Sequence, residues 1–173
     1  MRPGNLPEIM PGPEDTYQSV GYGWANLGNT LFRLFKQHDH EGGDRSPLIA
    51  HWPAGLGARG TFERSVNHVT DLLPTLLEVS GVSYPEDKRQ PIGRSIAAAL
   101  SGKKVADRET IFWKNAKGRA ARVGDWKLVA EGKGNWELYD LAKAPTELRD
   151  LAIAMPEKVE ELKGQWNAWH AKR

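Results

Sequence analysis

The side chains best suited to chemistry gather in one polar stretch, FRLFKQHDHEGGDRSP, which spans residues 32–47. Arg33 and Lys36 lie three residues apart, so a helical turn would place both cations on one face, where they could bind a sulfate or phosphate group. The alternative for Arg33 is a structural salt bridge to Glu41 or Asp44.

The same stretch contains the residue types of a metal site, namely His38, Asp39, His40 and Glu41. On a strand, His38 and His40 would share a face. A protein metal usually needs three or four ligands with supporting hydrogen bonds, and no matching pair lies nearby. We therefore predict no metal ligand here. Glu41-Gly42-Gly43 is better interpreted as a turn in which glycine allows a positive φ and Glu41 holds backbone amides.

Other aromatic and histidine side chains have simpler interpretations. Trp24 lies in a Gly-rich loop before Lys36 and is a candidate for lining a substrate mouth. His68 precedes a helical pattern, and we expect it to cap that helix with Asp71 rather than to face a cleft. His51 is expected to pack within a strand. Four tryptophans fall at core-facing positions of predicted strands and a helix: Trp126, Trp136, Trp166 and Trp169.

The composition excludes several classes of protein. The chain has 24 Lys+Arg against 22 Asp+Glu, and because these basic residues are scattered, we predict no nucleic-acid binding. It contains no apolar run of about 18 residues, so we expect no membrane span, and its first residues lack the apolar core of a secretory leader. The absence of cysteine excludes disulfides, thiolate metal sites and a cysteine nucleophile.

The elements that would position this stretch are uneven along the chain. Residues 1–60 are rich in Gly and Pro and show one strand pattern, PLIAHW at 47–52. Their aromatic content favours an ordered loop layer over disorder. A helix is predicted at 69–80, ending at Gly81, and a shorter one at 93–104.

Four strand patterns then follow in sequence order and predict a small antiparallel sheet. They cover 110–113, 119–123, 126–130 and 136–141, with Gly124-Asp125 as a two-residue hairpin turn. A helix is predicted at 156–173, with proline at its first position. Its apolar stripe should cover one face of the sheet: Val159, Leu162, Trp166 and Trp169.

Two blocks of sequence resemble the C-terminal part of arylsulfatase-type sulfatases, which belong to the alkaline-phosphatase-like superfamily. In the first, Lys36 is followed after four residues by Glu41-Gly42-Gly43, and then by Pro47 and Trp52-Pro53. The second runs from Arg119 to Asp150 and contains GDWKL and WELYDL. The resemblance extends over nearly the whole chain.

The resemblance implies an α/β fold, with an α+β arrangement in this segment. It would contain the end of an alkaline-phosphatase-like sheet, plus a small four-stranded antiparallel sheet packed by a C-terminal helix. Residues 1–105 would be the C-terminal portion of the main α/β domain, with the active-site lysine loop. Residues 106–173 would be a small C-terminal subdomain.

The resemblance also implies sulfuric ester hydrolysis. Lys36 would bind the sulfate and stabilise the leaving group, with Arg33, Trp24 and His40 as candidates for substrate binding. In the family, a formylglycine made from a Cys/Ser-x-Pro-x-Arg motif attacks the sulfur, and a calcium ion held by acidic residues polarises the sulfate. This chain has no cysteine, no Ser-x-Pro-x-Arg and no Asp-Asp pair. We therefore expect an inactive chain whose partner is a missing N-terminal sulfatase part.

Two departures from the family pattern are visible. Leu31 follows Thr30 where the family often has proline, and residues 114–118, KNAKG, replace an acidic Glu-His-Glu-Gly-Asn run. Two other functions stay open. One is a phosphodiesterase or phosphonate hydrolase of the same superfamily, whose metal ligands would also lie upstream. The other is a non-catalytic binding or interaction module.

Overall fold

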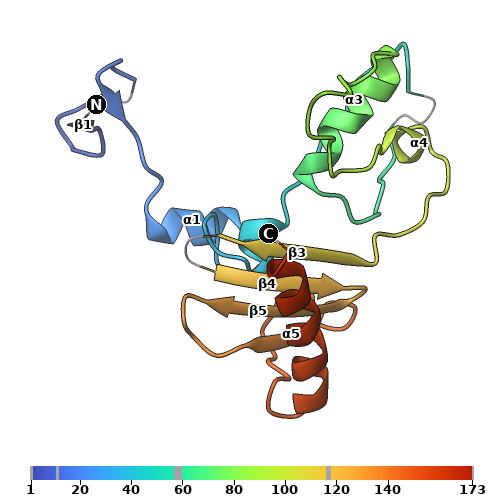
Figure 1. Ribbon diagram of the computed structural model, residues 1–173. Coiled ribbons are helices and arrows are strands. Elements are labelled where there is room, and N and C mark those ends of the chain that lie inside the picture. The colour runs from blue at the N-terminus through green and yellow to red at the C-terminus, as the bar shows by residue number, and fades with distance from the viewer. Residues whose placement is uncertain (1, 11, 57–59, 116–117, 173) are drawn as a thin grey trace. The chain divides into compact units, whose positions relative to one another are not determined.

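The computed structural model divides the chain into two compact units, shown as a ribbon in Figure 1. The sheet unit comprises residues 1–46 and 110–173, and the helical unit comprises residues 47–109. These units do not test the domain boundary predicted from the sequence, between residues 1–105 and 106–173 of an intact enzyme, which stays a prediction. The structure describes all residues except 1, 11, 57–59, 116–117 and 173.

The sheet unit is built on a four-stranded antiparallel sheet with the strand order β3-β4-β5-β6. Consecutive strands are neighbours throughout, and Gly124 adopts a φ of 58° in the turn between β4 and β5. The predicted sheet and its hairpin are therefore confirmed. The strands are β3 (Thr110–Lys114), β4 (Gly118–Val123), β5 (Trp126–Glu131) and β6 (Glu137–Asp140).

Helix α5 (Pro156–His170) packs against one face of this sheet (Figure 1). Leu162 and Trp166 are buried against Ala121, Leu128 and Leu138. The predicted apolar stripe of the helix is confirmed, because Val159 and Trp169 pack around the same cluster.

The opposite face of the sheet is only partly apolar. Ala120, Val129, Tyr139 and Leu141 form a second buried cluster there. Because side chains alternate along a strand, Lys127 shares this face with Val129. Polar side chains from residues 33–44 cover this face, including those of α2 (Glu41–Asp44).

Two further pieces precede the lysine region. Strand β1 (Arg2–Pro3) pairs in parallel with β2 (Thr16–Tyr17) in a separate two-stranded sheet. Helix α1 (Tyr22–Gly28) follows and buries none of its residues. None of the described helices is both long enough and apolar enough to span a membrane.

The helical unit contains η1 (Val69–Asp71), α3 (Leu72–Ser80) and α4 (Ala97–Leu100). The prediction that His68 caps the first helix is confirmed, because its side chain accepts from Thr70 N and its own N–H donates to the Asp71 carboxylate. Gly81 ends α3 in a left-handed conformation with a φ of 67°, as predicted. Helix α4 is shorter than the predicted 93–104.

The strand predicted at 47–52 is wrong, since the structure assigns these residues to no strand. The segment is exposed, with Ile49 at 88% and Trp52 at 44%, and His51 is also exposed rather than packed. A strand exists only when a neighbouring strand accepts and donates its backbone hydrogen bonds. Within the described residues of the helical unit, no segment does this for 47–52.

Candidate active-site lysine loop

The loop that carries Lys36, residues 32–45, folds back on its own glycines. Gly42 N–H donates to Arg33 O at 3.0 Å. A Cβ added to Gly42 would lie 2.3 Å from Arg33 O, and one added to Gly43 would lie 2.0 Å from His38 O. The predicted positive φ is wrong for both glycines. They are required because backbone passes against them too closely for any side chain.

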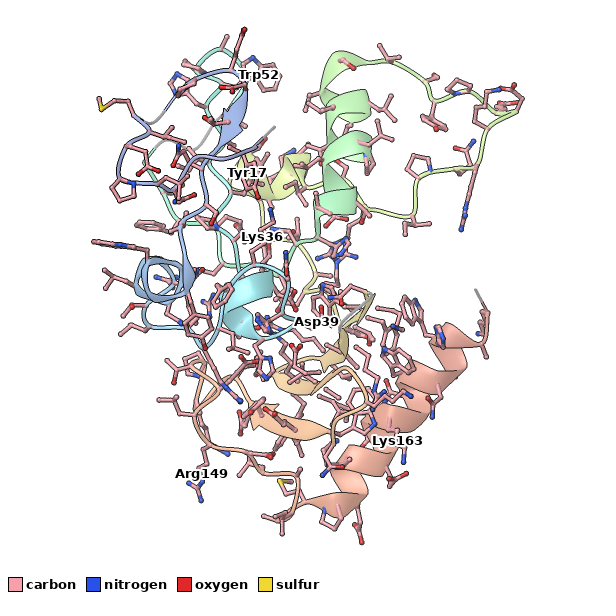
Figure 2. All side chains as sticks on the ribbon, turned by 90° about the vertical axis from the view of Figure 1, so that its left-hand side faces the viewer. Tyr17, Lys36, Asp39, Trp52, Arg149 and Lys163 are labelled. Carbon is pink, nitrogen blue, oxygen red and sulfur yellow. The ribbon has the colours of Figure 1, made fainter. Side chains whose placement is uncertain are left out.

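Lys36 lies at the tip of this loop, between two non-glycine residues with positive φ, Leu34 at 64° and Gln37 at 85°. Its side chain is exposed, and within the described residues it forms no hydrogen bond or ion pair. In Figure 2, Asp39 lies beside the strands and Lys36 lies on the other side of α2. The loop therefore presents an uncompensated ammonium group away from the sheet.

Arg33 and His40 converge on Glu137 of β6. Arg33 Nη1 donates to Glu137 Oε2 at 2.7 Å and to the Tyr139 hydroxyl at 2.6 Å, while His40 Nε2 lies 3.1 Å from the same carboxylate oxygen. Burial alone would raise the pKa of Glu137, but the hydrogen bonds from Tyr139, His40 and Arg33 hold it below its usual value. These two loop side chains thus bind the sheet.

The histidines also approach a second carboxylate. His38 Nδ1 lies 3.1 Å and His40 Nδ1 lies 3.5 Å from Glu131 Oε1. In the described part of the chain, no three His, Cys, Asp or Glu side chains are arranged to hold a metal ion. The sequence also has neither a Cys-x-Pro-x-Arg nor a Ser-x-Pro-x-Arg motif, so the residues present fit neither the calcium ion nor the formylglycine of intact sulfatases.

Asp39 is buried and connects the loop to the end of β3. Asn115 Nδ2 donates to Asp39 Oδ1 at 2.5 Å, and a Cβ on Gly118 would lie 2.4 Å from Asp39 Oδ2. Burial and the nearby Glu131 raise the pKa of Asp39. Asn115 and Gly118, which both come from the run KNAKG, thus lie against Asp39 of the lysine loop.

Lys127, which the sequence analysis did not single out, lies under α2. Its side chain is fully buried, and its Nζ lies 2.9 Å from Glu41 Oε1, 3.3 Å from Glu147 Oε1 and 3.5 Å from Asp44 Oδ2. Burial would lower the pKa of Lys127, but these carboxylates raise it. Burial also raises the pKa of Asp44 to about 7. Its burial could have been inferred from the sequence, because side chains alternate along a strand and Lys127 therefore shares the inward face of β5 with Val129.

Trp24 lies on α1 and is 70% exposed. Its helix meets the lysine loop through Tyr22, whose ring makes an edge contact with Phe35 at a centroid distance of 5.3 Å. The structure therefore brings Arg33 and His40 together on one carboxylate and leaves Lys36 and Trp24 exposed. Among the described residues, no hydrogen bond, ion pair or ring contact joins the side chains of Lys36 and Trp24.

An antiparallel meander packed by a C-terminal helix, preceded by a glycine-constrained lysine loop, matches the C-terminal region expected of sulfatases in the alkaline-phosphatase-like superfamily. Family comparison makes the assignment specific. Residues 32–169 match the model for N-sulphoglucosamine sulphohydrolase, C-terminal, and the chain belongs to this family.

Individual relatives agree with this assignment. A sulfatase from Formosa agariphila is 34% identical over 100 residues, covering 56% of this chain and 18% of the relative. An N-acetylgalactosamine-6-sulfatase from Canis lupus familiaris is 31% identical over 99 residues, covering 57% of this chain and 19% of the relative. The chain thus matches only about a fifth of the length of either relative.

Solved structures extend the similarity over more of the chain. A protein of the Bacteroides thetaiotaomicron locus for metabolism of multiple glycosaminoglycans superposes with a TM-score of 0.68 and 26% identity, over 84% of this chain and 33% of that one. The Ps i-CgsB structure gives a TM-score of 0.68 at 21% identity over 81% of this chain, which supports the fold alone.

Proposed function

We propose that this chain supplies the C-terminal part of a sulfuric ester hydrolase and that Lys36 is its catalytic residue. The observation that carries the proposal is the exposed Lys36 ammonium at the tip of a loop whose two flanks bind the sheet. An ammonium group held in this way can bind a sulfate oxygen and stabilise charge on the departing oxygen once water is excluded.

The other candidate side chains take different parts in this proposal. Trp24, which is exposed on α1, remains a candidate for contacting the substrate. Arg33 and His40 were predicted to bind substrate, but both side chains contact Glu137. Arg33 is half-buried and His40 is fully buried. Their role in the proposed function is therefore to fix the orientation of the loop.

The partner in this proposal is an N-terminal sulfatase part that carries the nucleophile and the calcium ligands. The helical unit exposes a set of apolar side chains that no described residue covers. They include Ile49 at 88%, Phe62 at 91% and Leu76 at 62%. Phe62 also lines a cavity of about 750 Å³, together with residues that include Leu48, Trp52 and Leu100. Exposed apolar surface of this kind marks an interface.

The unpaired segment 47–52 supports the same partner. Its sequence is that of a buried strand, yet its backbone has no neighbouring strand among the described residues of its unit. A partner sheet would supply those hydrogen bonds. Residues 1–105 would then complete a main α/β domain, and residues 106–173 would remain a small subdomain attached to it.

The first test uses the purified chain alone with 4-nitrocatechol sulfate. We expect no hydrolysis above the blank, because one lysine cannot supply the roughly 8 kcal/mol or more of barrier lowering typical of enzymes. Hydrolysis that disappears in Lys36→Ala would show that the chain needs no partner.

The second test uses the chain together with the proposed N-terminal sulfatase part, co-expressed with a formylglycine-generating enzyme. Lys36→Ala should lower kcat/KM by about 10²-fold or more, as loss of an oxyanion donor typically does. Lys133→Ala, which removes an exposed lysine from a turn, is the matched control and should change it less than about twofold. Equal turnover by the wild type and Lys36→Ala in this assembly would contradict the catalytic role of Lys36.

The leaving group separates the two roles of Lys36. If its ammonium stabilises the departing oxygen, Lys36→Ala should slow an alkyl sulfate more than nitrocatechol sulfate, because the alkoxide is the poorer leaving group. An equal loss for both substrates would restrict Lys36 to binding sulfate. Turnover of a phenyl phosphonate with no turnover of any sulfate would contradict the proposed reaction.

A further inference from the structure

A buried group of four charged side chains lies beneath the lysine loop, and we call it the Lys127 cluster: Lys127, Glu41, Asp44 and Glu147. The side chains of Lys127 and Glu147 are fully buried, and that of Glu41 is 4% exposed. The distances from the Lys127 ammonium to the three carboxylates are 2.9, 3.3 and 3.5 Å. One cation therefore holds three acids from two separate parts of the chain.

Stability alone gives little reason for this arrangement. Lys127 lies on the same face of the sheet as the apolar cluster of Val129 and Tyr139. An apolar side chain would extend that cluster, and replacing a buried ion pair by apolar groups is often neutral or stabilising. What the charge adds is a specific link to α2, because two of the three carboxylates that contact Lys127 are those of Glu41 and Asp44, which belong to α2.

Glu147 strengthens the same link from a third place in the chain. Its Oε2 accepts from Glu41 N–H at 2.7 Å, while its Oε1 faces the Lys127 ammonium. Its backbone adopts a φ of 55°, a conformation that is unfavourable for residues other than glycine. Such conformations persist where the surrounding contacts require them. The start of α2 is thus held by both its backbone and its side chain.

The contacts continue from α2 to both flanks of Lys36. Gly42 N–H donates to Arg33 O, and Gly43 lies against His38 O, so α2 touches the backbone before and after the lysine. We propose that Lys127 is a positioning residue for Lys36, which holds α2 on the sheet and thereby fixes the loop that presents the ammonium group. The inference rests on the role proposed for Lys36.

Hydrogen exchange of the 173-residue chain tests the link directly. Lys127→Met should speed exchange of amides in residues 33–44 by about tenfold or more while strands β4 and β6 and helix α5 change less than about twofold. Lys127→Arg keeps a cation and should restore the protection of the loop. The matched control is Arg122→Met, which removes the cation paired in register with Lys127 on β4, whose Nε donates to Gly124 O.

Glu147→Gln provides a second variant in case Lys127→Met does not fold. It preserves the shape of the side chain and removes its charge, so the same loop amides should exchange faster by a smaller factor. Unchanged loop exchange in the folded variants would overturn the inference. Equal acceleration throughout the sheet unit would also overturn it, because Lys127 would then be merely structural. If Lys127→Met does not fold, the result for Glu147→Gln decides.

Turnover by the complete enzyme distinguishes failure of this inference from failure of the proposed function. If Lys36→Ala leaves turnover unchanged while Lys127→Met loosens the loop, the function proposed for Lys36 is wrong and the structural link stands. If Lys36→Ala abolishes turnover while Lys127→Met leaves both loop exchange and kcat/KM unchanged, the positioning role is wrong and the function stands.

Discussion

The two units of the chain bury their side chains in different ways. Of the thirteen apolar side chains buried in the described residues, eleven belong to the sheet unit and two, Ile96 and Ala99, belong to the helical unit. The sheet unit has a core on each face of its sheet. The helical unit instead exposes most of the apolar side chains of α3. One chain thus contains a unit with a core and a unit with little core of its own, and the partner proposed above would bind the second.

The first prediction compares the truncation of one leucine in each unit, and the truncation in the sheet unit should have the largest effect on stability. Leu128 is fully buried between the sheet and α5, so Leu128→Ala should lower the free energy of unfolding by about 2–5 kcal/mol. Leu76 is 62% exposed on α3, so Leu76→Ala should change it by less than about 0.5 kcal/mol. Urea denaturation followed by circular dichroism measures both.

Equal losses for the two leucines would remove the contrast between the units. The same two variants also test the proposed N-terminal partner, which should bury Leu76. In the assembled enzyme, Leu76→Ala should then approach the cost of a core truncation, about 2 kcal/mol or more.

The second prediction concerns how the helical unit is held without a large core. The buried Asp71 carboxylate accepts from His68 N at 2.8 Å and Arg94 N at 2.9 Å, and it pairs with Arg108 at 2.5 Å. Asp71→Asn removes the charge and should cost the helical unit about 2–3 kcal/mol. Hydrogen exchange should rise in residues 72–80 and stay unchanged in the sheet. Asp87→Asn, at an exposed carboxylate, is the control, and a loss spread over both units would contradict the prediction.

The sequence predicted the sheet unit much better than the helical unit. The strands at 110–141 and the final helix carry their own hydrogen-bonding partners and apolar faces, so local pattern and turn residues specify them. The segment 47–52 has the sequence pattern of a strand. Among the described residues of its unit, however, no neighbouring strand is present to pair with it.

The lysine loop was predictable in position but not in detail. Lys36 and the Gly-Gly pair were identified from their spacing, whereas the contacts of Arg33 and His40 with Glu137 join residues about a hundred positions apart. Such long-range pairs leave no periodic signal in a single sequence. Lys127 showed a weak signal, as a charged residue at an inward position of a strand.

The third prediction compares a constrained glycine with an unconstrained one. A Cβ at Gly43 would lie 2.0 Å from His38 O, so Gly43→Ala must displace the backbone of the lysine loop, at a cost of about 1–3 kcal/mol. A Cβ at Gly28 meets no atom within 4 Å, so Gly28→Ala should be within about 0.5 kcal/mol of the wild type. Thermal unfolding measures both variants. A neutral Gly43→Ala would show that the loop tolerates a shift of its backbone.

The smallest effect depends on pH and should come from Asp44 in the sheet unit. Burial raises its pKa in the folded protein to about 7 from 3.8, so between these values the folded chain holds a proton that the unfolded chain has released. The stabilisation is therefore fully present below pH 3.8 and is lost as the pH rises through about 7. Each pKa unit corresponds to about 1.4 kcal/mol.

Asp44→Asn removes this titration while preserving the shape of the side chain. Between pH 5 and pH 7, the wild type should lose about 1–2 kcal/mol of unfolding free energy relative to Asp44→Asn. Urea denaturation at pH 5, 6 and 7 measures this difference, and Asp87→Asn should follow the wild type. Parallel curves for the wild type and Asp44→Asn would mean that Asp44 is already ionised at pH 5. Asp44 would then face the Lys127 ammonium as a carboxylate throughout this pH range.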